Sequence, residues 1–284
     1  MGPPIPIFSA TGGGSSTAGT AIAVVRVFLA LAPVALPAAY LVFLKREVAR
    51  YTIADGTRIS PPDPLLLTKN SGDGDDDIIP GEILASLEKF VVSRERVTSH
   101  AIPIASLRPD LVTAVRTSTD PDTNKNEDVR LGGLLEAYLS ATMRAFSWTP
   151  QALFIARYIG PSFGADTNDF ARSFQTPYLQ TCAFQPGDLV CGVYVVRSRH
   201  GSRVVLGLAP PHGWRGPVVR GVLNVGFERE GEGSVRFFNE TVLWRGTDER
   251  PTVLEGGVGR WMHGLLARWL VVRGVEAVTM TGGL

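Results

Sequence analysis

Polar side chains that could take part in acid–base chemistry lie on two segments in the last third of the chain. Arg220 and Asn224 alternate with apolar residues along 218–228, and Glu240 does so along 234–245. Because alternate residues of a strand share one face, Arg220 and Asn224 are expected on the same face of a sheet, with Val222 between them. A guanidinium, an amide and a carboxylate would polarise a substrate if this face lined a cavity. The alternative is that the face meets water, where charged side chains usually lie.

The histidines offer one further candidate for proton transfer. The four residues, at positions 100, 200, 212 and 263, are too scattered for a zinc motif. His263 lies beside Trp261 in an apolar segment with helical spacing, so it could serve as a general acid or base. A hydrogen-bonded histidine without a chemical role is the alternative. Because no nucleotide loop, metal cluster or nucleophile triad accompanies it, we expect neither a metal nor a cofactor.

Large aromatic residues of the same region could form the walls of a ligand pocket. The candidate catalytic residues are Glu240, Asn224 and His263. The candidate ligand-binding residues are Tyr194, Arg220, Trp244 and Trp261. Rigid aromatic surfaces can hold a flexible substrate in a reactive conformation, and a pericyclic reaction needs no nucleophile. Core packing alone is the alternative for the aromatic residues.

An antiparallel sheet followed by a long helix is expected to position these residues. Helical spacing predicts helices near 81–89, at 130–147, at 149–159 with Thr149 as N-cap, and at 258–273. Turn signals and β-branched residues predict strands at 90–102, 178–184, 189–199, 203–208, 218–228 and 234–245. This order predicts an α+β fold in which a curved antiparallel sheet packs on the C-terminal helix and leaves a ligand cavity. An open α+β sheet without a cavity fits the same order.

The two cysteines are expected to face each other across a hairpin. If Gln185 to Asp188 forms a four-residue loop, the register places Cys182 opposite Cys191. In a lumen the two thiols could be oxidised. In the cytosol they would be small buried apolar residues, which is the expectation adopted here.

The N-terminal part of the chain contains an uncharged run long enough to cross a bilayer. Residues 27–44 carry no charge, and a helix of that length spans roughly 27 Å. One basic residue precedes the run and three follow it by position 50, which favours a cytosolic C-terminal side. Two prolines within the run would kink the helix. A cleaved signal peptide, or a helix that is buried or lies on the membrane surface, is the alternative.

Composition divides the chain and limits its partners. We expect a disordered tail at 1–19, a membrane anchor at 20–50, a linker at 51–79, a ligand-binding α+β domain at 80–276 and a tail at 277–284. The net charge of +1 provides no basic surface for nucleic acid. The expected partners are therefore a hydrophobic small molecule and membrane lipid.

Three segments resemble a family of fungal proteins of specialised metabolism: Phe184–Val196, Asn239–Trp244 and Gly259–Leu270. The order of elements is also similar to START-like proteins of the helix-grip type. Members of the fungal family occur in gene clusters for terpenoid and polyketide products, and one looks like the norbornene-forming Diels–Alderase of sordarin-type pathways. The resemblance implies a cofactor-free cyclase or isomerase that acts on a hydrophobic intermediate at the endoplasmic reticulum membrane. It supplies no catalytic residue, and a non-catalytic, membrane-anchored lipid or metabolite carrier remains the alternative.

Overall fold

The computed structural model describes residues 40–60, 78–112, 132–159, 167–209, 219–231 and 233–280. The chain divides into a unit of residues 1–46 and a compact unit of residues 47–284. A helix covers 40–51. No helix within the described ranges is long and apolar enough to cross a membrane. The predicted tail at 1–19 and most of the run at 27–44 lie outside those ranges, so the membrane anchor stays a prediction.

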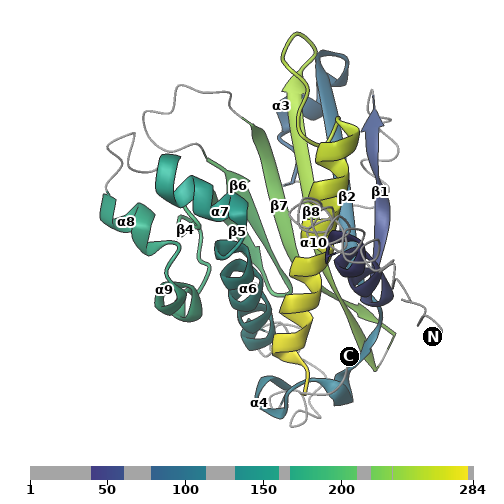
Figure 1. The fold of residues 1–284 in the computed structure, drawn as a ribbon, viewed down its shortest axis with the longest axis vertical. Helices are drawn as coiled ribbons and strands as arrows, with labels where there is room; N and C mark the ends of the chain where they lie inside the picture. The colour runs from purple at the N-terminus through teal and green to yellow at the C-terminus, as the bar shows by residue number, and fades with distance from the viewer. Residues whose placement is uncertain are drawn as a thin grey trace, which may run out of the picture. The chain divides into compact units, whose positions relative to one another are not determined.

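An antiparallel sheet of eight strands forms the centre of the compact unit (Figure 1). The strand order is β1-β2-β8-β7-β6-β5-β4, and β3 pairs with β8 off this path. The central strand β8 therefore pairs with β2, which comes early in the chain, and with β7, which directly precedes it. The strands are β1 Thr52–Ser60, β2 Phe90–Ser99, β3 Ile102–Pro103, β4 Leu189–Val190, β5 Tyr194–His200, β6 Arg203–Leu208, β7 Arg220–Glu230 and β8 Ser234–Gly246.

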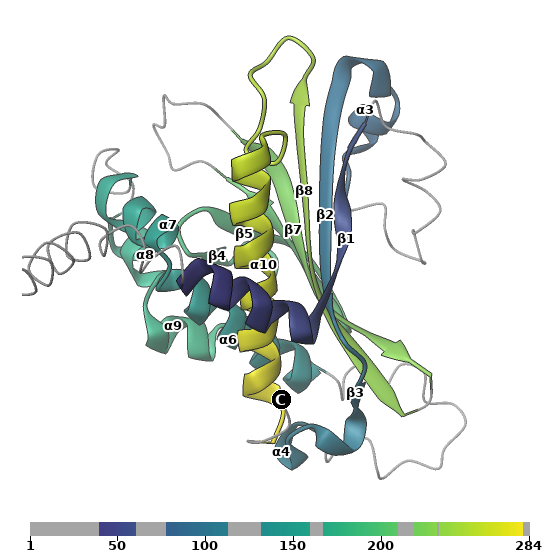
Figure 2. The same ribbon diagram turned by 45° about the vertical axis from the view of Figure 1, so that its right-hand side comes forward.

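Two antiparallel helices cover one face of this sheet, as Figures 1 and 2 show. They are α6 Gly132–Ser147 and the C-terminal α10 Gly257–Val278. Gly274 lies against Tyr138 and Thr142 of α6, so the two helices approach closely where α10 lacks a side chain. The remaining helical segments are α3 Gly81–Leu84, η2 Leu87–Lys89, η3 Ile104–Ser106, α4 Pro109–Val112, α7 Pro150–Phe154, the π-helix η4 Ile155–Ile159, α8 Thr167–Arg172 and α9 Thr176–Thr181.

Alternate residues of β8 belong to two separate apolar clusters, because successive side chains of a strand point to opposite faces. Val235 and Phe237 pack with α6 and α10 in the larger cluster. Val242 and Trp244 pack on the other face of the sheet, against Ile83 of α3. Both faces of the central strands are thus buried, and each face can hold a different kind of polar site.

The predicted α+β fold, with an antiparallel sheet packed against the C-terminal helix, is confirmed. The strands predicted at 203–208, 218–228 and 234–245 correspond to β6, β7 and β8. The helix predicted at 149–159 is present as α7 and η4, and the Thr149 hydroxyl caps it by accepting a hydrogen bond from the Ala152 N–H at 3.2 Å.

Other parts of the prediction need correction. The segment assigned to linker contains β1, which pairs with β2, and the tail expected from 277 begins later because α10 continues to Val278. The strand predicted at 178–184 is wrong, because Thr176–Thr181 forms α9 with a proline in its first turn. Proline suits that position since its missing N–H would have no helical partner there.

The predicted pairing of Cys182 with Cys191 is wrong, because the segment before Cys182 is a helix and not a strand. Cys182 caps the C-terminus of α9, while Cys191 lies in the turn between β4 and β5. The observed hairpin pairs Leu189 with Val195 and Val190 with Tyr194, so its turn is at 191–193 rather than at 185–188. Both cysteines are free thiols.

Candidate functional site

A histidine and a carboxylate meet between α10 and the sheet. The Nδ1 atom of His263 lies 2.5 Å from Oε2 of Glu95. Glu95 belongs to β2 and is buried, and the side chain of His263 is 24% exposed. A carboxylate can only accept a hydrogen bond, so this contact places the imidazole hydrogen on Nδ1. The other ring nitrogen, Nε2, is then available as a proton acceptor.

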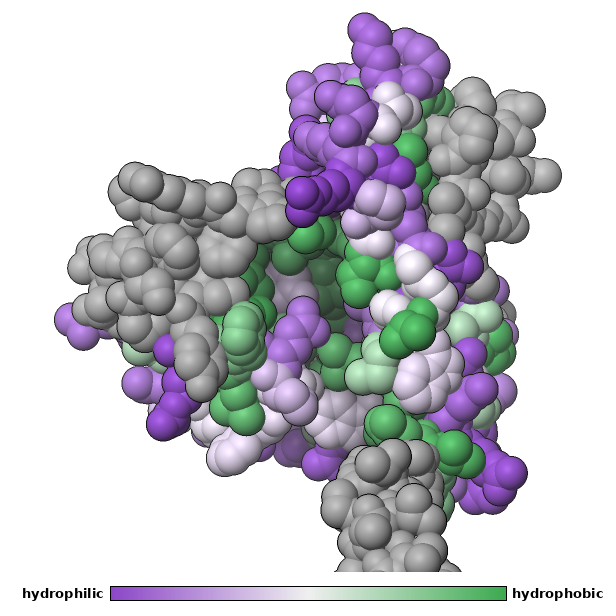
Figure 3. Space-filling model, turned by 45° about the horizontal axis from the view of Figure 1, so that its top comes forward, coloured by the Kyte–Doolittle hydropathy of each residue, from purple (hydrophilic) through white to green (hydrophobic). Residues whose placement is uncertain are grey.

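His263 lines a small cleft between α10, α6, α7 and the sheet. Its volume is about 50 Å³, enough for a water molecule or one functional group of a larger ligand. In the space-filling view, hydrophobic residues gather in a hollow of the surface (Figure 3). The lining of this central cleft is mostly apolar, and consists of Met143, Phe146, Gln151, Tyr194, Leu223, Asn239, Thr241, His263, Leu266, Ala267 and Leu270.

Tyr194 provides a second polar group in the central cleft. Burial raises the pKa of its hydroxyl, and Cys191 adds to that increase. The phenol therefore stays protonated at neutral pH and can donate a hydrogen bond. No described residue accepts a hydrogen bond from this hydroxyl. The hydroxyl is thus available to a carbonyl or hydroxyl oxygen of a ligand.

Asn239 belongs to the lining but is already engaged. The hydroxyl of Tyr138, which is fully buried on α6, donates to Oδ1 of Asn239 at 3.0 Å. Burial raises the pKa of Tyr138, so its proton stays in this bond. The pair therefore fixes α6 against β8 at the base of the cleft. His263 and Tyr194 remain as polar groups of the lining, together with Gln151 and Thr241.

The predicted residues Glu240 and Asn224 lie on the opposite face of the sheet. Register pairs them directly, and Nδ2 of Asn224 donates to Oε2 of Glu240 at 3.1 Å. Arg94 forms an ion pair with the same carboxylate, which is only 1% exposed. Because Asn239 and Thr241 point toward α10, the intervening Glu240 must point away from it. The structure therefore brings Glu240 and Asn224 together but separates them from His263.

The remaining predicted ligand-binding residues are also dispersed. Arg220 pairs with Glu249 near the surface. Trp244 is buried in the apolar cluster beside α3, on the face away from the central cleft. Trp261 lies on the outer side of α10 and is 38% exposed. Of the candidate residues, only His263 and Tyr194 share the central cleft.

The sequence does not indicate Glu95 as a site residue, because Glu95 stands in a run of three charged residues, Arg94 to Arg96. When charged residues lie on both faces of a strand, the sequence does not show which face is buried. The structure separates them, with Arg94 facing Glu240 and Glu95 facing His263. A carboxylate at an inward position of β2, across from a helix that carries a histidine, is the signal that could have found it.

The described part of the chain contains no candidate metal site. No group of three or more histidine, cysteine, aspartate or glutamate residues there could hold a metal ion. Comparison with known proteins finds no matching family model, no matching curated protein and no matching solved structure. The resemblance to the fungal family remains a prediction.

Proposed function

We propose that the chain binds a hydrophobic small molecule at the central cleft and catalyses its cyclisation or isomerisation without a cofactor. The observation that carries the proposal is the hydrogen-bond contact between the buried Glu95 carboxylate and Nδ1 of His263, at the edge of an apolar cleft. Such a pair is suited to moving a proton within a substrate, which is the step that an isomerisation requires.

The chemistry assigns separate roles to the two residues. His263 acts as the proton-transferring group, since Nε2 can accept a proton from one position of the substrate and return it to another. Glu95 acts as a positioning residue, because it holds the imidazole ring in one tautomer and stabilises the imidazolium that forms in between. Tyr194 donates a hydrogen bond to a substrate oxygen on which negative charge develops. The atoms balance without any further reactant.

The walls of the central cleft indicate the class of substrate. Phe146, Leu223 and Leu266 present apolar surface next to His263. The volume of about 50 Å³ holds only the reacting group, so the rest of the substrate lies across the opening of the cleft. A terpenoid or polyketide intermediate fits this description, and the resemblance of three segments to the fungal family supports that choice.

The strand order supports a START-like, helix-grip architecture as part of the proposal. β2 precedes the inserted helices and pairs with the last strand, and α10 then packs across one face of the sheet. This arrangement puts the ligand between sheet and C-terminal helix, where the central cleft lies. The uncharged run at 27–44 would tether the domain to the endoplasmic reticulum, on its cytosolic side.

A non-catalytic carrier of lipids or metabolites is the second candidate, favoured by the largely apolar lining of the cleft. A carrier needs only apolar walls. Catalysis needs the proton relay through His263. Removal of the His263 imidazole therefore distinguishes the two functions. It would stop turnover in an isomerase, but it would leave ligand binding by a carrier intact.

The test uses an extract of the producing organism in which this gene has been deleted. The purified full-length chain is added to the extract in D₂O, and the accumulated intermediate is followed by mass spectrometry. We expect a product that differs from the intermediate by no atoms other than exchanged solvent deuterium. The variants His263→Gln and Glu95→Gln should lose activity, while His200→Gln, at an exposed position, should retain it. Co-purification of an unchanged compound, with equal yield for all variants, would identify a carrier.

A further inference from the structure

A glycine in the middle of α10 lies directly against the candidate site. Gly264 follows His263 and precedes by three residues Ala267, which packs in the cluster between helix and sheet, so Gly264 shares the face that α10 turns to the sheet. Its backbone is part of the helix. A glycine there makes a helix less stable than an alanine does, because glycine loses more conformational freedom on folding. Gly264 therefore needs a reason other than backbone conformation.

The reason lies in what a side chain at position 264 would meet. A Cβ atom there would lie 2.6 Å from Oε1 of Glu95 and 3.7 Å from its Cδ. Apart from the adjacent turns of the helix, no other described residue has an atom within 4 Å of that position. Non-bonded heavy atoms rest at separations of about 3.5 Å or more. One carboxylate oxygen thus occupies the space that the methyl group of an alanine would take.

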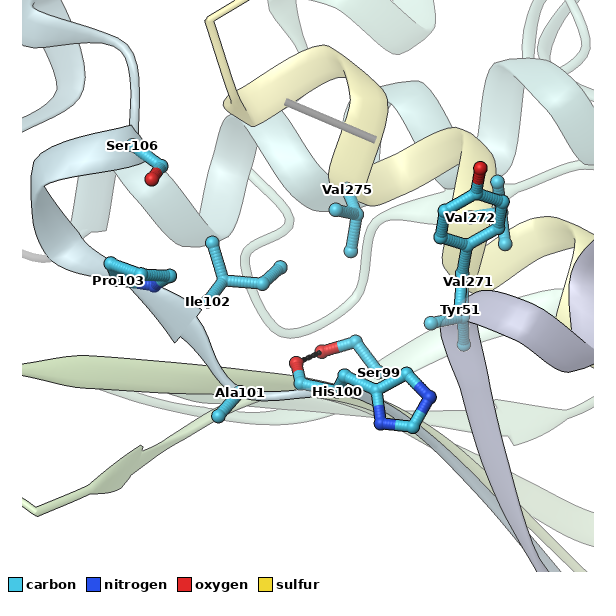
Figure 4. Close-up of a pocket in the computed structure, with 10 residues that line it drawn as sticks. All are labelled: Tyr51, Ser99, His100, Ala101, Ile102, Pro103, Ser106, Val271, Val272 and Val275. Carbon is cyan, nitrogen blue, oxygen red and sulfur yellow. Dashed lines mark hydrogen bonds between the residues drawn. The ribbon is translucent and has the colours of Figure 1, made fainter. Parts of the chain in front are cut away.

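Close approach of α10 to β2 does not explain the glycine. Towards the C-terminus of α10, a cavity of about 260 Å³ lies between the helix and the end of β2 (Figure 4). Figure 4 shows Val275 of α10 on one side of this cavity, with Ser99 and His100 on the other. At position 264 itself, a Cβ would meet no backbone atom of the described strands within 4 Å. The space beside Gly264 is therefore specific to the carboxylate.

The same carboxylate holds the imidazole of His263, because its other oxygen, Oε2, lies 2.5 Å from Nδ1. The two oxygens turn together about the Cγ–Cδ bond, so a group that displaces Oε1 also moves Oε2 relative to Nδ1. We propose that Gly264 is a positioning residue, whose missing side chain leaves the space in which the Glu95 carboxylate reaches His263. The contact is independent of the proposed function, whereas its role in catalysis rests on that function.

Gly264→Ala should displace the carboxylate and leave the fold intact. At Gly274 an added Cβ would meet Tyr138 and Thr142, which are fully buried. At Gly264 it would meet only the end of a flexible side chain, which can turn aside. The gain in helix propensity offsets the loss of one hydrogen-bond contact, so the melting temperature of the full-length chain should change by less than about 4 °C. A large fall in melting temperature would overturn the proposal, because the space would then not be specific to the carboxylate.

Proton NMR of the full-length chain, labelled with ¹⁵N-histidine, tests the contact without any substrate. The chain has four histidines, and the signal that is missing from His263→Gln identifies His263. In the wild type its Nδ1–H proton should lie far downfield and exchange slowly with water, because it is held by a carboxylate. In Gly264→Ala this signal should move upfield or disappear through exchange, as in Glu95→Gln. Gly257→Ala, where the added Cβ meets nothing within 4 Å, should keep the wild-type signal. An unchanged signal in Gly264→Ala would overturn the proposal.

Turnover of the accumulated intermediate then separates this proposal from the proposed function. Neither Glu95 nor Gly264 lines the central cleft, so Gly264→Ala should lower kcat by about tenfold or more and leave KM unchanged. In the Glu95→Gln background the same substitution should cost nothing further, because both changes remove one contact. Additive losses in the double variant would overturn the positioning role. If the NMR signal responds as expected but the wild type converts no intermediate, the contact is confirmed and the proposed function is wrong.

Discussion

Tyr138 of α6 and Asn239 of β8 are joined by a buried hydrogen bond of 3.0 Å, across 101 positions of sequence. The bond links the helix layer to the central strand, and both side chains are out of contact with water. Any change that removes one partner leaves the other unsatisfied in an apolar environment, which costs more than the bond itself contributes.

The first prediction concerns this bond. Tyr138→Phe should lower the free energy of unfolding by about 1–3 kcal/mol, because Oδ1 of Asn239 loses its donor. Chemical denaturation measures the change. Tyr178→Phe is the control, since the Tyr178 hydroxyl donates to the Leu189 carbonyl at 2.9 Å in a partly exposed position where water can replace it. An equal loss in both variants would contradict the role of burial.

Close packing of the two helices leads to a second prediction. A Cβ at Gly274 would overlap Tyr138 and lie 2.5 Å from Oγ1 of Thr142. Gly274→Ala should therefore destabilise the domain by about 1–3 kcal/mol. Gly257→Ala, at the start of the same helix, meets nothing within 4 Å and should be neutral or slightly stabilising. A stabilised Gly274→Ala variant would show that α6 and α10 are further apart than described.

Glu255 gives a prediction about pH. Two hydrogen bonds from Arg245, at 2.8 and 2.7 Å, lower the pKa of Glu255 to about 2, below its ordinary value of 4.5. Because the folded state holds the carboxylate in its charged form, the pair stabilises the fold above pH 4.5 and loses this effect as the pH falls toward 2. Solvent screens the partly exposed pair, so we expect about 1 kcal/mol.

The measurement compares the wild type with Glu255→Gln. The difference in unfolding free energy should be constant from pH 7 to about 5 and should shrink as the pH falls further. A difference that grows on acidification would have the wrong sign for a carboxylate with a lowered pKa.

The two faces of the sheet should respond differently to loss of a carboxylate. Glu95→Gln and His263→Gln should each lower the catalysed rate by about a hundredfold or more in variants that remain folded. Glu240→Gln should instead lower stability by about 2–4 kcal/mol, because Arg94 would be left without its charged partner. A reduced rate for a fully folded Glu240→Gln variant would reverse this assignment.

Membrane attachment through residues 27–44 is tested by extraction. We expect the full-length chain to stay in the membrane pellet in alkaline carbonate and to leave it only with detergent, since the run is uncharged over the width of a bilayer. Complete release by carbonate would favour a surface or buried helix.

The sequence predicts those parts of the fold whose periodicity is unbroken. β7 and β8 alternate over many residues, and α6 repeats its apolar positions every three or four residues, so their types follow from the pattern alone. Short elements with mixed signals are misread. Thr176–Thr181 carries β-favouring residues but starts with a proline at a helical first turn, and tertiary packing decides the outcome.

The candidate site is harder to predict, because its members meet through long-range pairing. Asn224 and Glu240 share a face as alternation requires, yet alternation alone does not say which face the C-terminal helix covers. His263 could be chosen by residue type. Its partner Glu95 lies 168 positions earlier and could be found only once β2 was placed beside β8.

The pairing of β2 with β8 has a consequence for how the protein is made. β5 to β8 form a run of neighbouring antiparallel strands and can assemble as they leave the ribosome, but β2 must wait for a strand that ends at Gly246. Contacts of such long sequence separation slow folding, and the waiting strand exposes its edge to other chains. Glu95 can meet His263 only after this closure. A nascent chain should therefore acquire its stability in steps, and the contact between Glu95 and His263 should form in the last one.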